Sequence, residues 1–113
     1  MFLSILQLIA IIATIAIGLF SLVAPTRIEG FTSLKAVGGR GAAEIRTIFG
    51  GVFIGMGVAA LLLDKSVAYP MFGIIYLTLG VIRVATIFVD GSRERSNLIS
   101  IASELLFGVL FLL

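Results

Sequence analysis

The sequence contains no cysteine, no histidine and no tryptophan, and only 12% of its 113 residues are charged. The absence of cysteine excludes disulfides, thiol nucleophiles, zinc–thiolate sites and cysteine-ligated clusters. The absence of histidine removes the usual acid–base group near neutral pH and a common ligand for copper and haem. Asp, Glu, Arg and Tyr remain, but they form no recognisable nucleophile–base pair or metal cluster. We therefore expect no catalytic residue, no metal, no cofactor and no enzymatic activity.

Apolar residues, by contrast, are abundant. Hydrophobic residues make up 60% of the chain, and the mean hydropathy is +1.26. A soluble chain of this length leaves a large share of its surface in water and could not bury so many apolar side chains. The net charge of +2 comes from 8 cations and 6 anions without any basic stripe, so nucleic acid is not an expected partner. The expected partner is the lipid bilayer.

Hydrophobic runs divide the chain into four expected membrane spans. The first charge is Arg27, and the run before it lacks a basic start and is longer than a signal-peptide core, so we expect a retained helix. Runs such as Leu61-Leu62-Leu63 do not alternate, which excludes the strands of a membrane barrel. We predict an all-α integral membrane four-helix bundle, a single domain over residues 1–113 with spans at about 2–23, 42–63, 69–89 and 97–113.

The connections between these spans carry the charges that predict orientation. Residues 24–41 form a loop that includes an interfacial helix around Phe31 to Val37, and a tight turn covers Asp64 to Ala68. The first and third connections hold five cations against one, Lys65, in the second. Because cytoplasmic loops are enriched in Lys and Arg, we expect the bacterial inner (cytoplasmic) membrane with both termini in the periplasm.

Small residues recur at helical spacing and predict where helices pack. Helices in lipid associate through close contact of small side chains and through polar pairs. The second span includes one GxxxG motif, Gly51 to Gly55, and we expect Gly55→Leu to disturb assembly more than Gly57→Leu. A heptad seam runs along the third span from Tyr69 to Asp90. The predicted packing glycines are Gly50, Gly51, Gly55, Gly57, Gly73 and Gly80.

Five charged residues fall within or at the ends of the predicted spans: Glu44, Arg46, Arg83, Asp90 and Glu104. An unpaired charge at the centre of a membrane helix costs at least about 2.5–3.5 kcal/mol, so opposite charges at matching depth are expected to pair. We predict Arg83 with Glu104, and Arg46 with Glu104 or Asp90. Glu44 is expected at the positive N-terminus of its helix. The network is interpreted either as a register-fixing structural element or as the lining of a polar pocket, and Arg83 could also snorkel to the surface.

One stretch has a family resemblance. The segment from Gly41 to Gly51 reads Gly-Ala-Ala-Glu-Ile-Arg-Thr-Ile-Phe-Gly-Gly, followed later by Arg83, by Asp90-Gly91 and by Ser103-Glu104-Leu105. These motifs resemble the bacterial membrane family called domain of unknown function 4345 (DUF4345), with Phe49 where Tyr is the more frequent residue. The resemblance covers nearly the whole chain. It implies a four-helix inner-membrane protein and supplies no catalytic assignments.

Two functions remain open on these grounds. The short loops and glycine-rich faces favour an accessory or scaffold subunit of a larger membrane protein complex, with membrane partner subunits or self-association. The alternative is a small transporter or hydrophobic-ligand-binding bundle that uses the intramembrane Glu/Arg network. The first span carries no charge, whereas small multidrug-resistance transporters place their essential carboxylate there, so the scaffold is the expected function.

Overall fold

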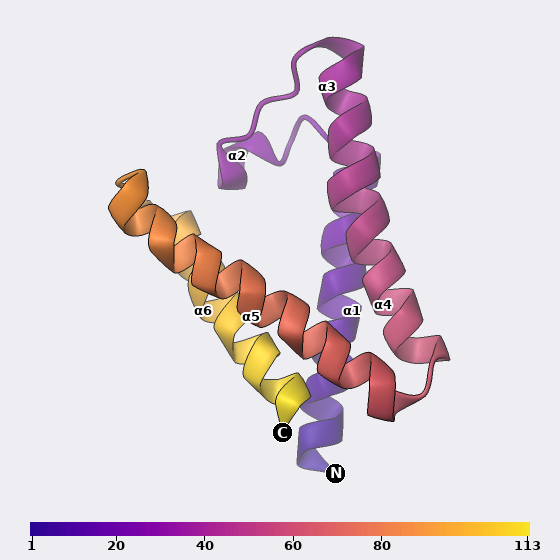
Figure 1. Ribbon diagram of the computed structural model, residues 1–113. Helices are drawn as coiled ribbons and strands as arrows, with labels where there is room; N and C mark the ends of the chain where they lie inside the picture. Colours follow the sequence, from indigo (N-terminus) through magenta and orange to yellow (C-terminus); the bar gives the residue numbers. More distant parts are fainter. The chain divides into compact units, whose positions relative to one another are not determined.

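The computed structural model describes residues 1–113, and all its regular secondary structure is helical (Figure 1). The elements in chain order are α1 (Phe2–Val23), α2 (Glu29–Thr32), α3 (Gly38–Glu44), the π-helix η1 (Ile45–Val52), α4 (Phe53–Leu62), α5 (Lys65–Val89) and α6 (Arg95–Leu112). Helices α3, η1 and α4 follow one another without a break. Four helical segments are therefore long and apolar enough to cross a membrane: Phe2–Val23, Gly38–Leu62, Lys65–Val89 and Arg95–Leu112.

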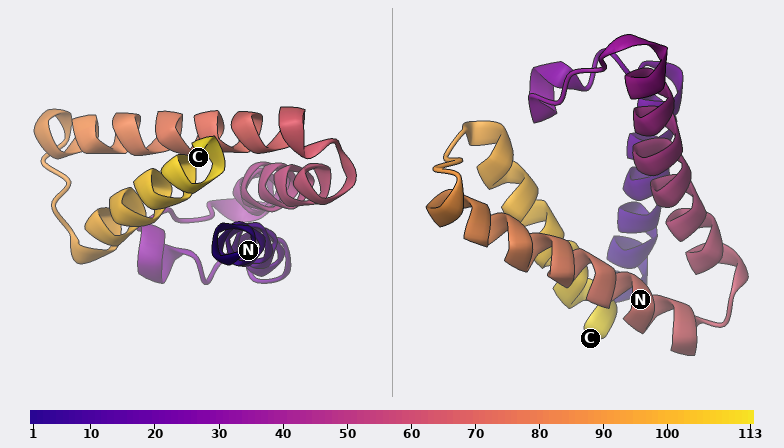
Figure 2. Two further views of the ribbon diagram at one scale, coloured as in Figure 1. Left: turned by 90° about the horizontal axis from the view of Figure 1, so that it is seen from below. Right: turned by 45° about the horizontal axis from the view of Figure 1, so that its top comes forward.

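The chain folds into two compact units. Unit 1 comprises Met1–Gln7 and Leu63–Leu113, and unit 2 comprises Leu8–Leu62. In unit 1, α5 and α6 lie side by side and antiparallel, joined by residues 90–94 (Figure 2). In unit 2, the remainder of α1 lies beside the continuous helix formed by α3, η1 and α4, also antiparallel. Each unit is therefore a helical hairpin.

Helix α5 begins earlier than the sequence indicated. Asp64 is its N-cap, and the carboxylate accepts a hydrogen bond of 3.0 Å from the backbone amide of Ser66. This hydrogen bond lowers the pKa of Asp64, and it fixes the helix start at Lys65. The predicted turn over Asp64 to Ala68 is therefore wrong. Pro70 lies in the second turn rather than the first, where it leaves the carbonyl of Ser66 without an intrahelical donor.

The first connection is shorter than predicted, because the second long helix begins at Gly38. Gly38 has a φ of 64°, which a glycine adopts without steric cost, and it turns the chain into α3. Within the connection, α2 covers Glu29–Thr32 instead of Phe31 to Val37. Ser33, with a φ of 62°, ends this helix as its left-handed C-cap.

In unit 2, three glycines allow the helices to approach closely. A Cβ atom added to Gly18 would lie 2.9 Å from the backbone nitrogen of Ile54. One added to Gly57 would lie 2.2 Å from Cγ1 of Ile15, and one at Gly50 would lie 3.2 Å from Cβ of Leu22. Since real Cβ atoms do not approach that closely, a larger residue at Gly18 has to displace the backbone of α4, and one at Gly57 has to displace the side chain of Ile15.

In unit 1, the predicted heptad seam of α5 lies against α6. A Cβ on Gly73 would be 2.9 Å from the carbonyl oxygen of Gly108, and one on Gly80 would be 2.7 Å from Cδ2 of Leu105. Aromatic rings of α5 also pack against aromatic rings of α6. The rings of Phe72 and Phe111 are 4.4 Å apart between centroids, and further edge contacts join Tyr69 to Phe111 and Tyr76 to Phe107. Glycine and aromatic residues thus alternate along the seam.

The GxxxG motif is not a packing contact within unit 2. A Cβ added to Gly51 or to Gly55 has no atom within 4 Å, whereas the same addition at Gly50 or Gly57 collides with α1. The expectation that Gly55 matters more than Gly57 is therefore corrected. The GxxxG spacing identifies a face of the helix, but α1 lies against a different one.

We predict that Gly57→Ala lowers the thermal stability of the detergent-solubilised protein, because the added methyl overpacks the contact with Ile15 at a cost of about 1–3 kcal/mol. Gly55→Ala is the matched control, two residues away on the same helix, and should leave stability unchanged or raise it. The measurement is the midpoint of thermal unfolding followed by circular dichroism. Equal destabilisation by both variants would contradict the helix packing described here.

Candidate functional site

The most deeply placed charges of unit 1 form an ion pair between α5 and α6. Nε of Arg83 donates to one carboxylate oxygen of Glu104 at 2.6 Å, and Nη2 donates to the other at 2.9 Å. Two parallel hydrogen bonds from one guanidinium are the strongest arrangement available to such a pair, because both partners are planar and their geometries match. The pairing expected from matching depth is present.

Asn97 extends this pair into a network. Its side-chain oxygen accepts a hydrogen bond of 3.2 Å from Nη1 of Arg83. Its amide nitrogen donates at 3.0 Å to the carbonyl of Ser92, in the connection between the helices, and at 3.3 Å to the hydroxyl of Thr86. Asn97 lies seven residues before Glu104, two turns earlier on the same face of α6, so Arg83 bonds to both. Asn97 was not among the residues of the predicted network.

The two members of the ion pair differ in burial. The Glu104 side chain is 9% exposed, and that of Arg83 is 38% exposed. Arg83 lies seven residues before Asp90, roughly 10 Å along the helix at 1.5 Å per residue. The long apolar stem of an arginine lets its guanidinium bond to a buried carboxylate while part of the side chain stays exposed. The arrangement thus neutralises the buried carboxylate, with the guanidinium on its outer side.

A second polar contact lies in unit 2, at the end of α1. The guanidinium of Arg46, on η1, donates to the backbone carbonyl of Leu22. Leu22 is in the last turn of α1, where carbonyl groups lack intrahelical donors and where a positive charge is favourable. Arg46 therefore caps the C-terminal end of α1. The predicted pairing of Arg46 with Glu104 or Asp90 is therefore wrong, and both oxygens of Glu104 are bonded to Arg83.

Glu44 and Asp90 stand outside this network. Glu44 is the last residue of α3 and not in its first turn, and it forms an exposed ion pair of 2.5 Å with Arg40 one turn earlier. Asp90 is exposed and is the C-cap residue of α5, where its backbone amide donates to the carbonyl of Thr86 at 2.9 Å. Of the five charged residues predicted to interact, the structure brings together Arg83 and Glu104.

The chemistry open to this arrangement is limited by its hydrogen bonding. Both oxygens of Glu104 accept from the guanidinium, and all three nitrogens of that guanidinium donate. Every buried side-chain nitrogen and oxygen has a hydrogen-bond partner. No three carboxylates gather at one place. Three of the five guanidinium N–H groups are bonded in this network. Setting the register of two helices is the best-attested use of buried polar groups.

Fold and site together define an all-helical protein with four helices that have the length and composition of membrane spans and one interhelical ion pair. A family model described as Domain of unknown function (DUF4345) matches residues 2–113. The chain therefore belongs to this family, as its motifs suggested. No curated protein matches the chain, and no solved structure matches it.

The ion pair generates a prediction on coupling. Glu104→Gln and Arg83→Gln should each destabilise the protein by about 3–5 kcal/mol, because each leaves a charged partner without compensation. The double variant should lose less than the sum of the two single losses. Unfolding of the four proteins in mild detergent, treated as a double-mutant cycle, measures the coupling.

The exposed pair of Arg40 and Glu44 serves as the control for this cycle. The same substitutions there should show a coupling close to zero, because solvent screens the charges. Additive losses at Arg83 and Glu104 would show that the two side chains do not stabilise each other.

Proposed function

We propose that this protein is an integral membrane protein without enzymatic activity that serves as an accessory or scaffold subunit of a larger membrane complex. The observation that carries this proposal is the polar network, in which both oxygens of Glu104 and all three nitrogens of the Arg83 guanidinium are already bonded. A transporter or an enzyme needs a polar group left for its substrate. A scaffold needs helices held in register, which this network provides.

The outer surfaces support placement in a bilayer. At most 28% of the residues in any of the four long apolar windows are buried within the protein. Large exposed side chains such as Ile12, Phe20 and Leu62 therefore cover the helices. In water this surface would cause aggregation, whereas lipid or an apolar partner covers it without cost. A scaffold with this surface recognises its partner by helix packing in the membrane.

A small transporter or hydrophobic-ligand-binding bundle is the second candidate, and one observation favours it. The Arg83 side chain is 38% exposed, so the ion pair is not sealed from one side. An anionic or polar substrate could compete with Glu104 for the guanidinium. The two functions differ in whether the charges themselves are required.

Replacing the pair by apolar residues separates these functions. For a scaffold, Arg83→Met combined with Glu104→Leu should still fold, because apolar residues of similar volume often substitute for a buried ion pair at no cost. The double variant should also retain a stoichiometric partner, measured by native mass spectrometry after gentle extraction. Arg95→Gln, at the exposed start of α6, is the control variant.

A transporter would give the opposite result. The wild-type protein would be found without a partner, and reconstituted vesicles would accumulate an anionic dye such as carboxyfluorescein under a pH gradient. The doubly apolar variant would fold and lose that uptake. This outcome would reject the scaffold proposal.

We further propose the bacterial cytoplasmic membrane, with both termini in the periplasm, on the excess of cations in the first and third connections. Fusions of alkaline phosphatase, which is active only outside the cytoplasm, should be active at Leu113 and at Lys65. Fusions at Lys35 and Arg93 should be inactive. The reverse pattern at all four sites would invert the proposed orientation.

A further inference from the structure

The connection between α1 and α3 is the longest in the protein and carries exposed apolar side chains. It spans residues 24–37, whereas residues 63–64 and 90–94 form the other two connections between long helices. Phe31 is 49% exposed, Leu34 41% and Val37 76%. A segment that only had to join two helices would not need three large apolar residues at its surface.

This connection has a defined local structure. The hydroxyl of Thr32 donates to the carbonyl of Ile28 at 2.8 Å, and the amide of Leu34 donates to that hydroxyl oxygen at 3.0 Å. The amide of Ser33 closes a further bond of 2.8 Å to the carbonyl of Glu29. Ile28, in the same segment, is 5% exposed and therefore buried. Phe31 and Leu34 are therefore held outward by an ordered backbone.

The net charge of the whole protein is concentrated on the same part of the chain. Residues 27–46 contain four cations, Arg27, Lys35, Arg40 and Arg46, and two anions, Glu29 and Glu44, which leaves +2. The remainder has four cations and four anions and is neutral, so the sum equals the net charge of +2.

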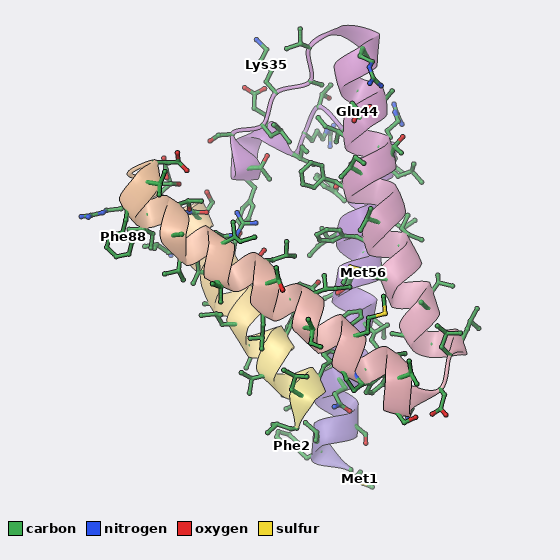
Figure 3. All side chains as sticks on the ribbon, in the orientation of Figure 1. Met1, Phe2, Lys35, Glu44, Met56 and Phe88 are labelled. Carbon is green, nitrogen blue, oxygen red and sulfur yellow. The ribbon has the colours of Figure 1, made fainter.

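Two of these four cations are available to a partner. Arg40 is paired with Glu44, and Arg46 caps α1. Arg27 and Lys35 are exposed, and neither forms an ion pair. The Lys35 side chain extends away from the ribbon at the end of unit 2 that carries α2 and α3 (Figure 3). Cations without an ion pair and exposed apolar side chains thus lie together within one short segment.

We infer that residues 27–37 bind the headgroup region of anionic phospholipids. Phe31, Leu34 and Val37 enter the boundary between headgroups and acyl chains, and Arg27 and Lys35 contact the lipid phosphates. Both helices that flank the segment have the composition of membrane spans, which holds it at the bilayer surface. Amphipathic segments with cations beside Phe and Leu bind such surfaces by combining apolar burial with electrostatic attraction. This inference rests on the membrane insertion proposed above.

The chain offers a clean reporter because it contains no tryptophan. Phe31→Trp, reconstituted in vesicles, reports which lipid lies beside the segment through quenching by brominated phosphatidylglycerol or brominated phosphatidylcholine. We expect brominated phosphatidylglycerol to quench the fluorescence at this position more strongly than brominated phosphatidylcholine does, because it binds there more strongly. Removal of one cation, by Arg27→Gln or Lys35→Gln in the Phe31→Trp background, should reduce the preference up to about fivefold, the equivalent of about 1 kcal/mol per cation.

Two controls sharpen the experiment. Phe88→Trp reports from the exposed end of α5, beside residues 90–95, whose two cations and two anions cancel, and should show no lipid preference (Figure 3). Lys65→Gln removes an exposed cation elsewhere and should leave the preference at position 31 unchanged. Circular dichroism of each variant checks that the helices are retained.

The possible outcomes separate this inference from the proposed membrane insertion. Equal lipid preference at positions 31 and 88, or a preference at position 31 that survives removal of both cations, would overturn the inference alone. Quenching at position 88 without any at position 31 would also overturn it. Absence of quenching at both positions would reject the membrane insertion itself.

Discussion

Close backbone approach between helices is the constraint on which both units depend. In a lipid environment the hydrophobic effect does not drive helices together, so contact area has to come from short interaxial distances. Glycine allows this in unit 1 through Gly73, Gly80 and Gly108, and in unit 2 through Gly18 and Gly57. The ion pair depends on the same contacts, since the guanidinium reaches both oxygens of Glu104 only when α5 and α6 are held together along their length.

The π-helix in unit 2 is coupled to the same constraint. Segment η1 carries Arg46 and Gly50, one turn apart, and both contact Leu22 at the end of α1. A π-helical turn is rare, so we expect other interactions to stabilise it. Here the cap on Leu22 and the close contact at Gly50 both do so. The motif by which the chain resembles its family lies on this segment, which gives the motif a structural reason.

The sequence was most informative where one physical requirement decides the outcome. Charge neutralisation at depth predicted Arg83 with Glu104, and the heptad seam predicted a packing face of α5, which the structure places against α6. It was least informative where local and tertiary effects compete. The positions of Gly51 and Gly55 satisfy the GxxxG pattern, yet α1 lies against Gly50 and Gly57, since spacing does not specify the face in contact. Arg46 donates to a backbone carbonyl and not to a carboxylate, because the C-terminal end of a helix also interacts favourably with a cation.

The distribution of charge connects these observations to the proposed role. Unit 1 contains the interhelical ion pair, and its four cations and four anions cancel. In unit 2 two cations without an ion pair, Arg27 and Lys35, lie in one connection beside exposed apolar groups. A protein that moved a substrate through its interior would be expected to place its uncompensated charge there. The opposite distribution, with a neutral interhelical seam and a cationic edge, is suited to a protein that is held in place by lipid and holds other helices in turn.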